Sequence, residues 1–263
     1  MTVTAKDVQN LRQATGVGMM DAKRALEATD GDMEAATQWL RVQGLASAAK
    51  RANREASEGA VAVVRDGNVA AIVELRCETD FVAKSEEFVT LADEIAARVC
   101  ADGDQSIVHF KENIDRMLTT LKENISIGRV YRLEAGPGEV VDTYLHHQSG
   151  RGVNAVAVVV KGADEEVAHE LAVHIAFARP LYLRREDVPQ SEVDAERSTV
   201  EQITRNEGKP EAAVPKIVEG RLNAWFKERV LLEQAYVKDE KETVQQFLKG
   251  ATISAYAQVV VGG

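Results

Sequence analysis

The chain has 263 residues, 45% of them hydrophobic and 28% charged, so it can bury a core beneath a solvated surface. Its formal net charge of -10 argues against a nucleic-acid-binding protein, because such proteins place Lys and Arg against phosphates. Two cysteines do not make a disulfide framework, and the longest apolar run, 153–160, is too short to span a bilayer. The polar N-terminal segment does not resemble a signal peptide, so we expect a cytoplasmic protein with reduced thiols.

The first 44 residues are predicted to form a three-helix module. Thr4, with Asp7 three residues later, gives a capping-box start, and two further helices are expected over about 19–28 and 33–44. The Ala-rich, charged stretch that follows is interpreted as a connector, and its run KRANR (50–54) is the only compact basic candidate for nucleic-acid contact. Because so small a bundle has a thin core, we expect a docking module and not an enzyme.

A β-rich unit is predicted next. The runs 59–64 and 69–75 flank RDGN, which is a hairpin turn signal. Ser85 can cap a helix whose apolar residues between 88 and 99 recur at spacings of three and four, so this helix should pack on the sheet. A more polar helical stretch follows at about 106–124.

The same order of elements then returns. Strands are expected at 128–135 and 138–147 about the turn GPG, then at 153–160. A helix follows in the segment 164–180, and Pro180 stops it soon after its end. A strand hairpin followed by a helix therefore occurs twice, which indicates two related α+β subdomains.

A helical hairpin is predicted at 187–227, where the stop signal NEGKP separates two amphipathic segments. The sequence leaves open whether its apolar stripes pack only on each other or pair with a second copy. Beyond it we expect strands at 230–237 and 252–261 around a short helix at 241–249.

The stretch ELRCETDFVAK (74–84) raises the question of a chemical site. Glu74, Cys77, Glu78 and Asp80 could supply metal ligands or a nucleophile, but no histidine lies near them in sequence. Zinc sites use paired Cys and His spacings, and a nucleophilic cysteine needs a His partner. Cys77 is therefore interpreted as a small core residue on a strand.

The remaining sequence shows no convincing catalytic constellation. His169 and His174 are five apart, which is not a same-face spacing on a helix, so they make a poor chelate. The run TGVGMMDAK has two glycines but neither a Walker nor a dinucleotide pattern. We therefore expect no metal, no cofactor and no covalent chemistry.

Phe81 can be read in two ways. It precedes Phe88 by seven residues, so a helix that started early would place both in the core. Alternatively, an aromatic side chain at a strand-to-helix junction, preceded by a carboxylate, has the composition of a recognition probe. The residues alone do not decide between these readings.

Two long motifs, LRQATGVGMMDAKRAL and CETDFVAK, resemble the signature motifs of the bacterial elongation factor Ts family. Three further stretches in the same order resemble that family as well, so the similarity covers nearly the whole chain; they are DGDMEAATQWLRVQG, HIAFARPLYL and GKPEAAVPKIVEGRLNAWF.

The resemblance implies an α+β fold with a ubiquitin-associated-like N-terminal module, two related α+β subdomains and an inserted antiparallel helical hairpin. The expected boundaries are 1–54 for the module and connector, 55–138 for core subdomain N, 139–186 with 228–263 for core subdomain C, and 187–227 for the hairpin. It also implies a guanine-nucleotide exchange factor that binds elongation factor Tu·GDP, displaces Mg²⁺ and accelerates GDP release. The alternative is a Tu-binding scaffold or chaperone that does not exchange nucleotide.

The family's site residues map onto two kinds of position here. Thr79, Asp80, Phe81 and Val82 match the motif associated with dislodging Mg²⁺ from Tu, with Phe81 as a wedge between partner helices and Asp80 as a bonding group. Partner-binding candidates on matching positions are Arg12, Met19, Met20 and His146, although the two methionines could instead pack the small bundle.

Two departures from the family pattern accompany these matches. Arg76 stands where the family commonly has Asn, and the loop HHQSGRGVN after His146 differs from the usual sequence. The chain also ends at AQVVVGG, without the additional C-terminal helix through which some members contact Tu.

Overall fold

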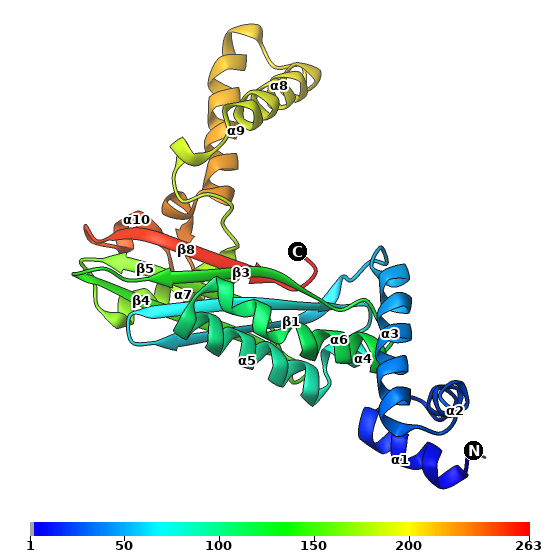
Figure 1. The fold of residues 1–263 in the computed structure, drawn as a ribbon. Helices are drawn as coiled ribbons and strands as arrows, with labels where there is room; N and C mark the ends of the chain where they lie inside the picture. Colours follow the sequence, from blue (N-terminus) through cyan, green and yellow to red (C-terminus); the bar gives the residue numbers. More distant parts are fainter. Residues whose placement is uncertain (1–2) are drawn as a thin grey trace. The chain divides into compact units, whose positions relative to one another are not determined.

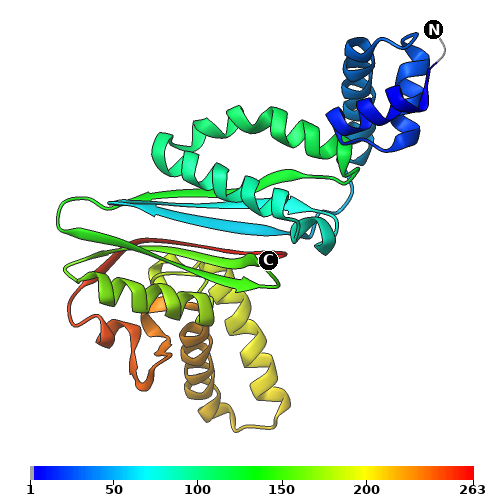
Figure 2. The same ribbon diagram turned by 90° about the horizontal axis from the view of Figure 1, so that it is seen from below.

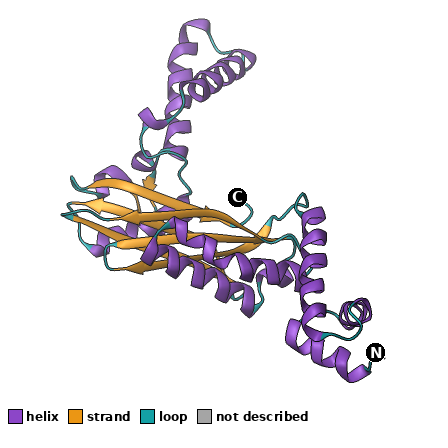
Figure 3. Cartoon of the chain, in the orientation of Figure 1, coloured by secondary structure: helices purple, strands orange, loops and turns teal. Residues whose placement is uncertain are grey.

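The computed structural model describes residues 3–263, whose helices and strands form an α+β fold, as the sequence predicted (Figures 1 and 3). The chain divides into two compact units. The first contains the described residues up to Arg132 together with 145–155 and 259–263, and the second contains 133–144 and 156–258. The finer boundaries expected from the sequence stay predictions.

Three helices open the first unit: α1 (Ala5–Thr15), α2 (Met19–Ala28) and α3 (Met33–Arg51). The predicted capping box is confirmed, because the Thr4 N–H donates to the Asp7 carboxylate at 3.0 Å and the Asp7 N–H donates to Thr4 Oγ1 at 3.3 Å. Buried side chains of all three helices make one small core; they are Val8, Leu11, Val17, Ala22, Ala25, Leu26, Ala36 and Leu40.

The predicted end of the third helix at Gly44 is wrong, because α3 continues to Arg51. Its continuation is rich in alanine, which has the highest helix propensity. Gly44 serves a different purpose: a Cβ at this position would lie 2.5 Å from the side chain of Thr119 on α6 (Lys111–Thr120). The glycine therefore allows close approach of α3 to α6 and is not a stop signal.

The sheet of the first unit has the strand order β1 (Glu58–Asp66), β2 (Val69–Cys77) and β3 (Ser126–Glu134). The predicted hairpin is confirmed, since β1 and β2 pair antiparallel across the RDGN turn. Helix α5 (Glu86–Asp102) buries its apolar face on this sheet, and Figure 2 shows α5 and α6 along one side of it. The expected polar helix at 106–124 is instead a 3₁₀ segment, η1 (Asp104–Phe110), followed by α6.

The other sheet has the order β4 (Glu139–Gln148), β5 (Arg151–Lys161) and β8 (Thr252–Val260), and α7 (Glu165–Ala178) follows β5. The predicted pairing of 128–135 with 138–147 about GPG is wrong, because β3 joins the first sheet and β4 the second. In β3, the Arg129 backbone N–H and guanidinium donate to Glu74 of β2, which ties the strand there. Each sheet thus contains a hairpin whose second strand is flanked by a later, third strand.

The predicted helical hairpin is present as α8 (Gln190–Asn206) and α9 (Val214–Arg229), which lie side by side (Figure 1). Short 3₁₀ turns, η2 (Arg185–Asp187) and η3 (Glu211–Ala213), precede the two helices. Apolar side chains of both helices pack on one another in a small cluster: Val200, Val214, Val218 and Leu222.

The segment after the hairpin differs from its prediction as a strand over 230–237. It forms η4 (Leu231–Glu233) and then the two-residue strand β6 (Ala235–Tyr236), which pairs with β7 (Asp239–Thr243). The reason is that Leu231 and Leu232 donate their backbone N–H groups to the carbonyls of Tyr182 and Leu183. The helix expected at 241–249 is shortened to α10 (Val244–Phe247). No helix among residues 3–263 is both long and apolar enough to cross a membrane.

Candidate functional site

The turn between β2 and α5 presents one aromatic side chain to solvent. It contains the one-turn helix α4 (Asp80–Ala83), and Phe81 on this helix is 84% exposed. Ala83 is buried, and Val82 packs against the core beneath α5, so the two residues after Phe81 point inward. The reading of Phe81 as a core residue is therefore wrong.

Local capping explains why Phe81 does not share a face with Phe88. Thr79 is the N-cap of α4, and its Oγ1 accepts the Val82 N–H at 3.4 Å. Ser85 interrupts the helix: its backbone is extended, its hydroxyl donates to the Val82 carbonyl at 2.8 Å, and α5 begins only after it. Because α4 and α5 are separate helices, the seven-residue spacing does not place the two aromatics together.

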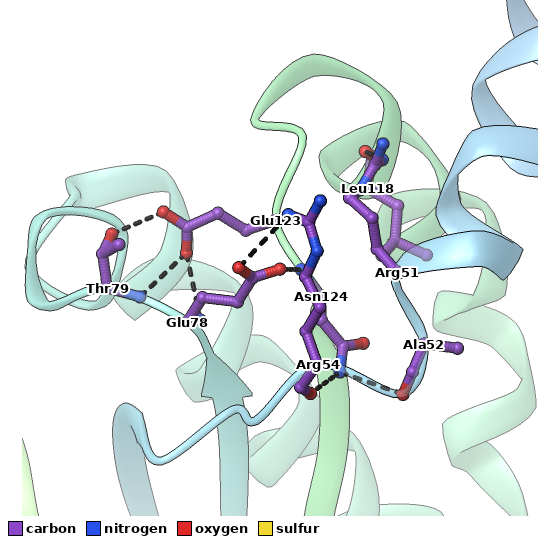
Figure 4. Close-up of polar contacts among 8 residues, drawn as sticks. All are labelled: Arg51, Ala52, Arg54, Glu78, Thr79, Leu118, Glu123 and Asn124. Atoms are coloured by element: carbon purple, nitrogen blue, oxygen red, sulfur yellow. Dashed lines mark hydrogen bonds and ion pairs between the residues drawn. The ribbon is translucent and has the colours of Figure 1, made fainter.

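The backbone just before α4 is fastened to a distant segment, as Figure 4 shows. Glu123 accepts the N–H groups of Glu78 and Thr79 at 3.1 and 3.0 Å, and it also accepts the Thr79 hydroxyl. In the reverse direction, the Glu78 carboxylate accepts the Asn124 N–H at 2.6 Å. The backbone of the turn is therefore hydrogen-bonded to the segment at 123–124, whereas the Phe81 ring at its tip is exposed.

Asp80 carries a negative charge beside Phe81. Its carboxylate accepts a hydrogen bond from Lys84 one helical turn later. This bond, assisted by the positive charges of Lys84 and Arg151, holds the pKa of Asp80 below its usual value. The turn consequently offers an exposed aromatic ring next to an ionised carboxylate at neutral pH.

The other groups in this stretch have structural roles. Burial, with a smaller contribution from the charge of Glu123, raises the pKa of the Cys77 thiol to about 12, so it is protonated at neutral pH and a poor nucleophile. Burial opposes ionisation of Glu74, but hydrogen bonds from Arg129 and Arg76 outweigh it and lower the Glu74 pKa to about 2. Across residues 3–263, no group of three or more His, Cys, Asp or Glu side chains is arranged to hold a metal ion.

The remaining predicted site residues lie on other elements of the first unit. Arg12 is exposed on α1, while Met19 and Met20 are exposed at the start of α2, with Met20 at 67%. Neither methionine belongs to the small core of the module, so the packing alternative is wrong for them. His146 is exposed near the end of β4.

Sequence reasoning missed Glu123 altogether. It lies 44 residues after Thr79, in a polar stretch with no motif, just before β3, which pairs with β2. It also left the departure at Arg76 without an explanation. In the structure the Arg76 guanidinium forms an ion pair with Glu74 at 2.9 Å.

Comparison with known proteins identifies the family. The family described as Elongation factor TS matches residues 78–263. The chain is 44% identical over 273 residues to Elongation factor Ts of Clavibacter michiganensis subsp. michiganensis, with 98% of each chain covered. It is 45% identical over 275 residues to that of Leifsonia xyli subsp. xyli, with 99% of each covered, and 43% over 269 residues to that of Mycobacterium tuberculosis, with 98% of each covered.

The chain belongs to the elongation factor Ts family. Membership makes it a translation elongation factor and confirms the resemblance carried by its motifs. The family match begins at Glu78, immediately before Thr79, and therefore includes the whole Phe81 turn. The relatives also cover the N-terminal helices that precede this match.

Proposed function

We propose that the chain binds elongation factor Tu in its GDP-bound form, displaces Mg²⁺ and accelerates GDP release so that GTP can rebind. The observation that carries this proposal is the exposed Phe81 ring on a rigidly capped turn, at the Thr-Asp-Phe-Val motif of an elongation factor Ts. Aromatic side chains are enriched among the residues that dominate binding energy, so this ring is a suitable anchor for a pocket on a partner.

The physical mechanism is competition for the nucleotide site of the partner. A GTPase holds its nucleotide through a phosphate-cradling loop and a Mg²⁺ ion that bridges the phosphates. In the proposal, Phe81 wedges between helices of Tu, and the ionised Asp80 bonds at the invaded site. Loss of the ion weakens the phosphate contacts and raises the GDP off-rate. This chain performs no covalent chemistry in the process.

The binding free energy needed for exchange requires more than one contact between the chain and Tu. Coupling between two ligands is reciprocal, so a factor that weakens GDP binding is itself weakened equally by GDP. Weakening the nucleotide by ~10⁴-fold needs roughly 5.5 kcal/mol of differential binding, whereas one aromatic hot spot supplies ~2–4 kcal/mol. We therefore propose Arg12, Met19, Met20 and His146, which are exposed on other elements than the turn, as further contacts to Tu.

The test is the release of labelled GDP from purified Tu, measured with wild type and with Phe81→Ala. Wild type should accelerate release, and Phe81→Ala should lose most of that acceleration, by about 30-fold or more for a hot spot of ~2 kcal/mol. Tyr131→Ala is a matched control, since Tyr131 is an exposed aromatic on β3 of the same unit. Chelation of free Mg²⁺ should reduce the difference in GDP release rate between wild type and Phe81→Ala, because the chelator then removes Mg²⁺ from Tu in place of the factor.

The outcomes separate the alternatives. If wild type binds Tu without accelerating release, the chain is a scaffold or chaperone and the exchange proposal is wrong. If both proteins accelerate release equally, exchange stands but Phe81 is not its centre.

A cytoplasmic location, the compartment of translation, is part of the same proposal, as is the absence of direct nucleic-acid contact. Pairing of two copies through α8 and α9 is also a proposal, which sedimentation of the purified chain would test.

A further inference from the structure

Three hydrogen-bond donors of the Phe81 turn converge on one carboxylate. Glu123 Oε2 accepts the backbone N–H groups of Glu78 and Thr79, and Oε1 accepts the Thr79 hydroxyl (Figure 4). These donors belong to the two residues immediately before α4. Hydrogen bonds to a charged acceptor are roughly twice as strong as neutral ones, so three of them on one carboxylate hold the start of α4 firmly.

A helix of a single turn needs such hydrogen bonds from outside the helix to stabilise it. Forming the first turn of a helix fixes several residues for very few hydrogen bonds, so α4 would not persist by itself. Thr79 contributes the cap, because its Oγ1 accepts the Val82 N–H. The proton of the same hydroxyl goes to Glu123, which fixes the rotamer in which Thr79 can cap the helix.

Glu123 can act as an anchor because its own segment is fixed. The next residue, Asn124, donates its backbone N–H to Glu78 and its side-chain amide to the carbonyls of Ala52 and Arg54, at 3.2 and 2.8 Å. Arg54 also forms an ion pair with Glu78 at 3.5 Å. Each of the two segments therefore offers a carboxylate to the backbone of the other.

We propose that Glu123 is a positioning residue for nucleotide exchange: it fixes the cap of α4 and thereby the direction in which Phe81 projects. It acts through Thr79 and does not itself contact the partner. The inference rests on the proposed exchange function, whereas the contacts that motivate it belong to the chain alone. It predicts that loss of Glu123 misplaces Phe81 without removing it.

A short series of variants tests this role. Glu123→Ala leaves the N–H groups of Glu78 and Thr79 without their acceptor and frees the Thr79 hydroxyl. Glu123→Gln keeps an oxygen for the two N–H groups, and its amide can donate to Thr79 Oγ1, so it should retain most of the function. Glu94→Ala is the matched control, because Glu94 is an exposed carboxylate on α5 of the same unit.

The readout is the rate of labelled GDP release from Tu as a function of factor concentration. We expect Glu123→Ala to lower the plateau rate about tenfold, which corresponds to ~1.4 kcal/mol, and to leave the half-saturating concentration within about twofold. Glu123→Gln should restore most of the plateau. A general loss of folded protein would instead shift the apparent concentration scale and the thermal midpoint, which is measured alongside.

A double-mutant cycle with Phe81→Ala decides whether Glu123 acts through the aromatic ring. In the Phe81→Ala background, adding Glu123→Ala should have almost no further effect on the plateau. Amide hydrogen exchange of Thr79 and Val82 should accelerate in Glu123→Ala and stay slow in Glu94→Ala.

Three results would overturn the inference. Unchanged acceleration by Glu123→Ala would refute it and leave the proposed function intact. Additive effects of the two substitutions would mean that Glu123 acts independently of Phe81. If wild type itself does not accelerate release, both the proposed function and this inference are wrong, and faster amide exchange in Glu123→Ala would then report a structural role only.

Discussion

Phe81 and Phe88 are the same residue type seven positions apart, yet they occupy opposite environments. Phe88 has no exposed surface and packs beneath the sheet formed by β1, β2 and β3, whereas Phe81 is almost fully exposed on α4. Their difference comes from the capping residues that start their two separate helices, Thr79 before Phe81 and Ser85 before Phe88, and not from hydrophobicity. The buried ring of Phe88 contributes to the core, whereas the exposed ring of Phe81 is available for the proposed contact with Tu, and each can be tested by its own substitution.

The largest effect on stability is expected from Phe88→Ala. Removing a fully buried phenylalanine loses its transfer free energy and leaves a cavity, so the free energy of unfolding should fall by about 3–5 kcal/mol. Phe81→Ala is the matched substitution and should change the free energy of unfolding by less than ~0.5 kcal/mol, as for other surface positions. Urea denaturation of both variants measures the contrast, and similar losses would show that Phe81 also supports the fold.

This contrast also shows how far the sequence could lead. Helix starts with local signals were predicted correctly, as at Thr4, and so was the β1–β2 hairpin with its RDGN turn. The choice between core and probe for Phe81 needed the break at Ser85, which spacing alone does not reveal.

The errors arose where the decisive contact is distant in sequence. Gly44 looks like any helix stop until Thr119 is brought against it, and Glu123 has no local signal for its role at Thr79. The pairing of β3 with β2 likewise depends on Glu74 meeting Arg129, 55 residues later. Local patterns give the elements, whereas pairings between them depend on side chains that meet only after folding.

The comparison of a buried with an exposed residue can be repeated with two glutamates. Substitution of the buried one should change the free energy of unfolding by less than Phe88→Ala does, but by more than substitution of a helical glycine does. Glu74 is buried and accepts hydrogen bonds from Arg129 at 2.8 and 2.9 Å, whereas Glu94 is exposed on α5. Glu74→Gln should lower the free energy of unfolding by about 2–3 kcal/mol at pH 7, because it breaks a charged hydrogen-bond pair and leaves the arginines uncompensated. Glu94→Gln should change it by less than ~0.5 kcal/mol.

The pH dependence of this effect has a definite sign. The pKa of Glu74 is about 2 in the folded chain, against 4.5 as the ordinary value, so the unfolded state binds more protons between these limits. The contribution of the Glu74 carboxylate to the free energy of unfolding is complete above pH 4.5 and is lost as the pH falls toward 2. Urea denaturation between pH 7 and pH 3 should therefore show wild type and Glu74→Gln converging in acid. A constant difference across this range would mean that the loss comes from packing and not from charge.

Two glycines within helices, one in close contact and one in open space, give the third comparison. Their substitution should have the smallest effect on the free energy of unfolding. A Cβ at Gly44 in α3 would lie 2.5 Å from Thr119, whereas at Gly220 in α9 it would meet nothing within 4 Å. Alanine in an open helical position gains about 1 kcal/mol over glycine, so Gly220→Ala should stabilise the chain by up to that amount. Gly44→Ala gains the same propensity but must push α3 away from α6, and overpacking costs typically 1–3 kcal/mol, so a net loss of about 1 kcal/mol is expected.

The opposite signs of these two substitutions test the contact between α3 and α6 directly. Thermal or urea denaturation of both variants is sufficient, because helix propensity contributes equally to each and cancels in their difference. If Gly44→Ala were stabilising, the close approach of Gly44 to Thr119 would not limit the residue at this position. In that case the N-terminal helices would not be held by close packing on α6. The polar links from Asn124 to the carbonyls of Ala52 and Arg54 would then fasten the module to the segment that carries Glu123.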